Sequence, residues 1–145
     1  MGDISKDVNS TFKDNRTKAL INILYTANWI SSKQNTFFAK FDLSPQQYNI
    51  LRILRGAQEP LTMQTVKDRM IERAPNATRL TDKLCAKELI NRIPCESDRR
   101  VVYIAITAKG LKLLEDISED FNEEWLKNIS QKEAALLSDL LDKLR

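Results

Sequence analysis

The chain has 145 residues, a usual length for a single domain, and 42% of them are hydrophobic. A domain of this size buries about 68–70% of its unfolded surface. It therefore needs no disulfide scaffold, and we interpret its two cysteines as reduced thiols. The N-terminus is polar and acidic, and no apolar run approaches the ~18 residues of a membrane helix. These features predict one cytoplasmic domain over residues 1–145, with neither a signal peptide nor a membrane span.

The net charge of +3 is unevenly distributed. Residues 52–109 carry twelve basic and seven acidic side chains, whereas residues 110–145 carry five basic and nine acidic ones. The middle of the chain can therefore face a polyanion that the C-terminal part would repel. Histidine is absent, which removes the commonest general base and a frequent metal ligand. We expect no enzyme, no catalytic residue, no metal and no cofactor.

The first predicted element is a helix over about residues 10–40. Such a helix would be ~45 Å long, whereas a compact chain of this size has a radius of gyration of only ~15 Å. Its apolar stripe therefore needs a second surface, which predicts a homodimer. The stripe follows a spacing of three to four residues and comprises Leu20, Ile23, Leu24, Ala27, Ile30, Phe37, Phe38 and Phe41.

Three shorter helices are predicted next. Ser44 suits the N-cap of the first, Pro45 its first turn, and Gln47 can complete a capping box, with Gly56 ending the helix. The second follows Leu61-Thr62 and includes Val66, Met70 and Ile71 as apolar positions. The third runs from about residue 76 to 87, and a 100° wheel gives its outward face as Thr78, Arg79, Asp82, Lys83 and Ala86.

The apolar period then changes to two. Residues 89–94 and 101–107 read as strands, joined through the polar residues 96–100 as a hairpin. Thr107 is expected to cap a fifth helix, and Ser130 with Glu133 forms a second capping box at the start of the last helix. The predicted apolar positions are Leu111, Leu114, Ile117, Phe121 and Trp125 in the fifth helix and Leu137, Leu140, Leu141 and Leu144 in the last.

The resulting fold class is mainly α with a small β-hairpin wing. Residues 44–107 form a winged helix-turn-helix, flanked by dimerisation helices at 8–41 and 108–145. In this geometry the second helix of the pair enters the major groove of double-stranded DNA. Arg79 and Lys83 can reach guanine edges or phosphates, and Thr78 a phosphate or a thymine methyl. The alternative is an ordinary solvated helix face.

The hairpin tip strengthens the DNA interpretation. Arg99 and Arg100, with Arg92 on the incoming strand, can place a guanidinium in a narrow minor groove, where the negative potential is greatest. Asp98 can hold one arginine in its fork geometry. The predicted DNA-binding residues are Asn76, Thr78, Arg79, Lys83, Arg92, Asp98, Arg99 and Arg100.

Three segments, in their order and spacing, resemble the MarR (multiple-antibiotic-resistance regulator) family. They are Leu43–Arg52, Asn76–Leu84, and Asp98-Arg99-Arg100 followed by Ile106–Gly110. The resemblance implies a dimer held by its first and last helices, a pseudopalindromic operator and, often, a small ligand that weakens DNA binding. It matches the family's wing arginine to Arg100 and its helper aspartate to Asp98. Glu88 departs from the pattern, because the family commonly has a glycine there, which eases a left-handed residue.

We therefore expect a sequence-specific transcriptional regulator, a repressor that binds its operator as a homodimer. One hypothesis is that a small aromatic ligand binds at Tyr25 and Trp29, which share a helix face, and releases the regulator from DNA. The favoured interpretation of these two rings is that they pack against the fifth helix through Phe121 and Trp125. The competing function is a winged-helix module for protein–protein contact without DNA binding. Such a module would not need Arg79, Lys83 and Arg100 on one side.

Two further patterns admit structural interpretations. Acidic side chains form two i, i+4 stripes in the fifth helix, and nothing else converges on them, so a solvated face is expected. Cys85 is expected to be a small core residue, and Cys95, near the wing, the more exposed thiol. The acidic residues are Glu115, Asp116, Glu119, Asp120, Glu123 and Glu124.

Overall fold

The structure is a computed structural model that describes residues 2–72, 75–120 and 126–145. The chain divides into two compact units, Met1–Leu111 and Lys112–Arg145. Phe121 and Trp125, predicted as apolar positions of the fifth helix, lie outside the described residues, as do Glu123 and Glu124. Among the described residues, no helix combines the length and apolarity that a membrane span requires.

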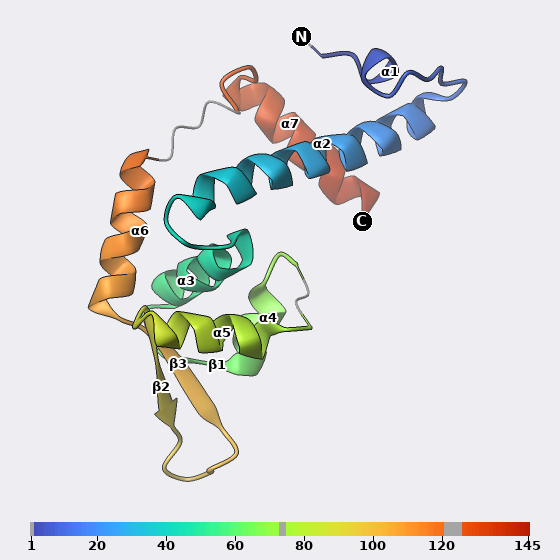
Figure 1. Cartoon of the computed structure of the whole chain (residues 1–145). Helices are drawn as coiled ribbons and strands as arrows, with labels where there is room; N and C mark the ends of the chain where they lie inside the picture. The colour runs from blue at the N-terminus through green and yellow to red at the C-terminus, as the bar shows by residue number, and fades with distance from the viewer. Residues whose placement is uncertain (1, 73–74, 121–125) are drawn as a thin grey trace. The chain divides into compact units, whose positions relative to one another are not determined.

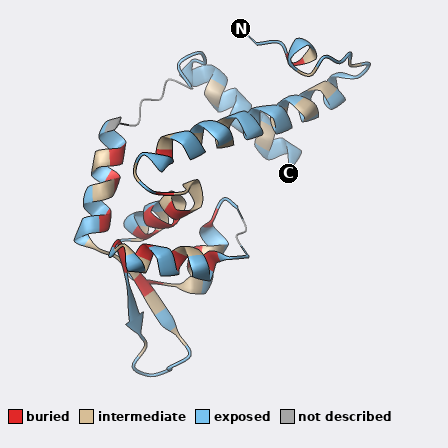
Figure 2. Ribbon diagram, in the orientation of Figure 1, coloured by how far each residue is buried: buried red, intermediate tan, exposed pale blue. Residues whose placement is uncertain are grey.

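The first unit is built on a helix-turn-helix that packs on a small antiparallel sheet (Figure 1). This winged part comprises the helices α3 (Pro45–Ala57), α4 (Met63–Arg69) and α5 (Ala77–Ala86) and the strands β1 (Leu61–Thr62), β2 (Ile90–Pro94) and β3 (Val102–Ile106), in the order β1-β3-β2. The core lies between these elements, as Figure 2 shows. Its fully buried side chains include Ile50, Leu51, Leu54, Val66, Leu84, Ile90 and Ile104. The winged helix-turn-helix fold predicted from the sequence is confirmed.

Local capping signals place the helix starts. The backbone N–H of Gln47 donates to Ser44 Oγ at 3.2 Å, and that of Ser44 donates to Gln47 Oε1 at 2.9 Å, which completes the predicted capping box. Thr62 caps α4 through the N–H of Thr65. At its other end α3 continues past Gly56, which was predicted to end it, to Ala57, and the C-cap residue Gln58 has a left-handed φ of 57°.

The predicted first helix begins later than expected. A short helix α1 (Ile4–Asp7) comes first, and α2 runs from Asn15 to Ala39. Asp14 stops the helix from extending backwards, because its carboxylate accepts the N–H of Thr17 at 3.1 Å and so acts as the N-cap. The expectation of a helix from about residue 10 is therefore wrong at its start. α2 is still about 38 Å long, and Phe38 is its only buried residue.

Two details of the structure, a third strand and an exposed isoleucine, differ from what the sequence predicted. β1 adds a third strand, pairing Leu61 with Ile104 and Thr62 with Tyr103. Ile71, expected as an apolar position of the third predicted helix, is 87% exposed, because α4 already ends at Arg69 and Ile71 lies beyond it. The two-residue pairing of β1 with β3 depends on tertiary contacts rather than on local sequence pattern.

The connections at the base of the wing are tight. Glu88 has a φ of 60°, so the position where the MarR family commonly has glycine is left-handed here as well. Thr107 Oγ1 donates to the Glu88 carbonyl at 2.8 Å and accepts the N–H of Gly110 at 3.0 Å, which confirms Thr107 as a cap. A Cβ on Gly110 would lie 2.4 Å from the carbonyl oxygen of Leu89, so only glycine fits at this position.

The second unit contains the later part of α6 (Ala108–Asp120), which crosses the boundary between the units, and α7 (Gln131–Leu144). The predicted capping box at Ser130 and Glu133 is present, with the N–H of Ser130 donating to Glu133 Oε2 at 2.8 Å. No residue of α7 is buried. Its exposed leucines are Leu136, Leu137, Leu140 and Leu144.

Candidate nucleic-acid interface

The outer face of α5 is polar and basic, and its inner face holds the helix on the core. Ala77, Thr81 and Leu84 are fully buried. All five residues predicted for the outward face are exposed: Thr78, Arg79, Asp82, Lys83 and Ala86. Arg79 and Lys83 are spaced i, i+4 and therefore lie one turn apart on the same side of the helix. The buried side of α5 thus holds two cations at the surface. Among the described residues, neither the guanidinium of Arg79 nor the ammonium of Lys83 forms an ion pair.

Asn76 stands at the N-cap of α5, but its side chain makes no capping hydrogen bond. Its carbonyl accepts the N–H of Leu80 at 3.1 Å, so the helix begins there while the exposed amide of Asn76 projects outward. The first N–H groups of the helix therefore lack a side-chain cap, and such groups attract phosphate oxygens.

The wing tip is a turn that Asp98 organises. Its carboxylate accepts the backbone N–H of Arg100 at 2.9 Å, and its carbonyl accepts the N–H of Val101 at 3.0 Å. The N–H of Cys95 then donates to the Val101 carbonyl at 3.1 Å and closes the turn. The structure thus places Asp98 on the backbone of Arg100 rather than on an arginine guanidinium, which was the expectation. The side chains of Arg99 and Arg100 are exposed at this tip.

Arg92, predicted to reach DNA from the incoming strand, faces α5 in this structure. Its guanidinium contacts the carboxylate of Asp82, and its Nη2 donates to Thr81 Oγ1 at 3.4 Å. Arg92 and Asp82 are 43% and 53% exposed, so this ion pair lies at the surface between α5 and the hairpin of β2 and β3. No local sequence pattern signals this contact, because the two residues come from different elements.

The two cysteines differ in their surroundings. The hydroxyl of Ser97, 3.1 Å from Cys95 Sγ, and backbone N–H groups of the wing turn hold the pKa of Cys95 below its usual value. Burial raises the pKa of Cys85, and the nearby Arg92 only partly opposes this effect. Both thiols are half-buried and reduced.

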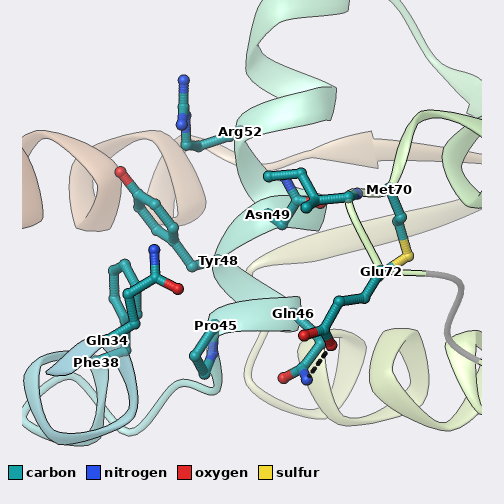
Figure 3. A pocket seen from close by; sticks show the side chains of 10 residues that line it. Gln34, Phe38, Pro45, Gln46, Tyr48, Asn49, Arg52, Met70 and Glu72 are labelled. Carbon is teal, nitrogen blue, oxygen red and sulfur yellow. Dashed lines mark hydrogen bonds between the residues drawn. The ribbon is translucent and has the colours of Figure 1, made fainter. Parts of the chain in front are cut away.

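A cavity of about 100 Å³ lies where the end of α2 meets the helix-turn-helix (Figure 3). Phe38 and Tyr48 stack with ring centroids 4.2 Å apart, and the Arg52 guanidinium lies 5.9 Å from the Tyr48 centroid. Asn49 and Ile71 also line this cavity, and Asn49 Oδ1 accepts the backbone N–H of Ile71 at 3.2 Å. Sequence analysis missed this site, because Tyr48 looks like one more apolar position and Phe38 comes from another helix.

The predicted ligand residues Tyr25 and Trp29 line a different cavity, of about 370 Å³, next to α1. Ile4 and Asp7 of α1 border it together with Asn22 of α2. Lys33 Nζ already lies over the Trp29 ring, 5.8 Å from its centroid. The alternative packing of Tyr25 and Trp29 against Phe121 and Trp125 concerns residues outside the described ones.

Comparisons with known proteins assign this architecture. The MarR family profile matches residues 43–102. The transcriptional regulator MhqR of Bacillus subtilis is 30% identical over 79% of this chain and 81% of its own length. A crystal structure of a cysteine-to-serine mutant of MarR from Escherichia coli with operator DNA superposes with a TM-score of 0.76 at 24% identity, over 92% of this chain and 99% of the other. NadR in complex with 4-hydroxyphenylacetate superposes with a TM-score of 0.67 at 24% identity, over 86% and 89%. From the α5 face, the wing and these relatives, we conclude that the chain belongs to the MarR family and is a transcription regulator, not an enzyme.

Proposed function

We propose that this regulator is a cytoplasmic repressor that binds a pseudopalindromic operator as a homodimer. The observation that carries the proposal is the pair of exposed basic surfaces on one winged unit, the α5 outer face and the wing tip. A helix of this kind fits the major groove and a hairpin tip the adjacent minor groove. The MarR structure solved with operator DNA has the same fold.

Each predicted residue then takes a role that follows from its position. Arg79 and Lys83 reach base edges or phosphates in the major groove, and Thr78 contacts a phosphate or a thymine methyl. Asn76 binds a phosphate beside the uncapped first amides of α5. At the wing, Arg99 and Arg100 enter the minor groove, and Asp98 keeps their turn in shape.

The homodimer would be formed by the flanking helices, residues 8–41 and 108–145. α2 carries Leu20 and Leu24 on one face at 51% and 54% exposure, and α7 exposes Leu140 and Leu144 at 56% and 66%. A monomer rarely leaves so many leucines in water on two helices, since exposed apolar patches usually mark contact surfaces.

The experiment is binding of the purified protein to fragments selected from the source genome, followed by fluorescence anisotropy at several salt concentrations. We expect log K to fall linearly with log salt, because bound cations release counterions from DNA. Arg79→Ala should weaken operator binding by about 1–3 kcal/mol and relax specificity at one position in each half-site. A protein that binds no selected fragment, or an Arg79→Ala variant that binds as the parent does, would leave the protein–protein module as the better description.

A small aromatic effector that lowers DNA affinity completes the proposal. The cavity at Tyr48 and Arg52 offers aromatic lining and a cation to an aromatic acid, and the cavity at Tyr25 and Trp29 offers two rings. A ligand acts only through different affinities for the DNA-competent and incompetent states. A tenfold loss of DNA affinity needs about 1.4 kcal/mol of such coupling.

Tryptophan fluorescence separates the two cavities, because Trp29 borders only one of them. Phenolic and other aromatic acids should release labelled operator. Quenching that Trp29→Phe abolishes over the same concentration range would place the ligand beside Tyr25. Release that survives Trp29→Phe but is lost in Arg52→Gln would place it beside Tyr48. No release by any aromatic acid would argue against this effector class.

A further inference from the structure

Hydrogen bonds and an ion pair join α5, the proposed recognition helix, to the wing at two separate places. At the C-terminal end of α5, the N–H of Leu89 donates to the Leu84 carbonyl at 3.0 Å as the chain passes directly into β2. The second place lies further back along α5, where the Arg92 guanidinium contacts Asp82 and donates to Thr81 Oγ1. A single attachment at the helix end would act as a hinge, whereas two separated attachments fix a direction.

We propose that Arg92 is a positioning residue, which holds the wing at a fixed angle to the recognition helix instead of contacting DNA. Arg92 pairs with Ile104 in the middle of the hairpin ladder, so a constraint on Arg92 is a constraint on the whole hairpin. The wing tip with Arg99 and Arg100 lies beyond this point, so a small rotation at Arg92 becomes a larger displacement there.

Asp82 is the other half of this device. It lies on the exposed face of α5 between Arg79 and Lys83, where a carboxylate would repel DNA if its charge were not compensated. Arg92 supplies that compensation. Thr81, fully buried, donates its hydroxyl to the Thr78 carbonyl at 2.8 Å and presents its lone pair to Arg92, so the acceptor site is itself anchored in the core.

A competing explanation makes Arg92 a direct phosphate contact. The two explanations predict opposite effects of Asp82→Asn on DNA affinity. If Arg92 only binds phosphate, Asp82→Asn removes a repulsive charge and frees a guanidinium, and DNA binding becomes tighter. If the pair orients the wing, Asp82→Asn weakens DNA binding although it makes the surface more positive. Arg92→Gln should then weaken DNA binding to about the same extent as Asp82→Asn, although the two substitutions change the surface charge in opposite directions.

The test measures operator affinity of full-length variants at several salt concentrations. We expect Asp82→Asn and Arg92→Gln each to weaken binding about tenfold, within the range measured for neighbours in one ion-pair network. The double variant Asp82→Asn/Arg92→Gln should weaken it no more than either single one. Glu96→Gln is the matched control, because it removes an exposed acid from the wing turn that has no ion pair among the described residues. It should leave DNA binding unchanged or slightly tighter.

The positioning role of Arg92 rests on the DNA binding proposed above. A measurement without DNA tests this role separately from the proposed function. Both side chains are about half exposed, so the pair contributes little to folding stability and the variants should melt like the parent. Backbone ¹⁵N relaxation should show the wing amides of Arg92→Gln gaining motion relative to those of α5. Unchanged wing dynamics, or tighter DNA binding by Asp82→Asn, would overturn the inference. A parent protein that binds no DNA but whose wing loosens in Arg92→Gln would overturn the proposed function alone.

Discussion

Helices α3 and α7 are alike in sequence and different in surroundings. Each begins with a serine capping box and carries leucines at helical spacing. α3 buries four residues inside the winged unit, namely Gln47, Ile50, Leu51 and Leu54, whereas α7 buries none. The comparison shows that a helix and its apolar face are encoded locally, but that the surface covering this face is not. α7 retains an apolar face for which we expect a second copy of the chain.

The largest expected effect is at α7. Leu140→Asp should convert a dimer to a monomer, because two-fold symmetry repeats a lost leucine and a new carboxylate in each copy. The loss is about 2–5 kcal/mol per leucine buried in the dimer. Light scattering should give a mass falling from about twice the 16.7 kDa chain to a single chain.

Ser138→Asp is the control, because it adds the same charge about 160° away from Leu140 on a 100° wheel. It should leave the mass unchanged. If Leu140→Asp is also without effect, α7 lies outside the dimer contact and resembles α3 in pattern only.

The next largest effect is expected in the winged unit, where side chains are closely packed around Gly110. Gly110→Ala should destabilise the fold by about 3 kcal/mol, since a Cβ there would lie 2.4 Å from the Leu89 carbonyl oxygen and 2.8 Å from Ile106 Cγ1. Urea unfolding measures the change. Gly56→Ala, in α3, is the matched control, because nothing lies within 4 Å of its Cβ, and it should stabilise by about 0.5–1 kcal/mol. Equal effects of the two substitutions would contradict the packing at the base of the wing.

A smaller gain is expected at Glu88. Glu88→Gly should stabilise the protein by about 1 kcal/mol, because a left-handed φ of 60° is unfavourable for a side chain with a Cβ. The lost ion pair to Lys109, at 3.4 Å and well exposed, offsets little of this gain. Thermal unfolding of the variant checks the sign. A lower midpoint would mean that the entropy glycine adds to the unfolded chain outweighs the relieved strain.

The smallest change affects reactivity without affecting the fold. Cys95 should react with iodoacetamide at a lower pH than Cys85, because hydrogen bonds from the wing turn lower the pKa of Cys95 while burial raises that of Cys85. Mass spectrometry of peptides alkylated between about pH 6 and 9, a range that brackets the usual thiol pKa, gives the two profiles. Ser97→Ala should move the Cys95 profile to higher pH and leave that of Cys85 in place. Identical profiles for the two thiols would contradict this account of the wing turn.

Local chemistry was the predictable part of this molecule. The capping boxes at Ser44 and Ser130 and the two strands of the wing depend on neighbours in sequence, and the structure has them as predicted. The family resemblance also marked Glu88 as a position with unusual backbone geometry. These features need no knowledge of what packs against them.

The remaining features depend on contacts between distant segments. The strand β1 exists only because Leu61 meets Ile104, and the cavity at Tyr48 only because Phe38 of another helix stacks on that ring. The sequence predicted Arg92 as a DNA contact, and its charge pattern does not reveal that Asp82 faces this side chain. The sequence therefore predicted the two basic surfaces, but it did not predict which of their charged side chains pair with each other.

The closed wing turn has a kinetic consequence. Three hydrogen bonds among Cys95, Asp98, Arg100 and Val101 hold its backbone in place in the DNA-free protein. A preformed tip loses little conformational entropy when it meets a groove. Association with DNA should then be limited by diffusion and orientation instead of by loop ordering. The residence time on DNA, more than the association rate, should therefore distinguish one DNA sequence from another.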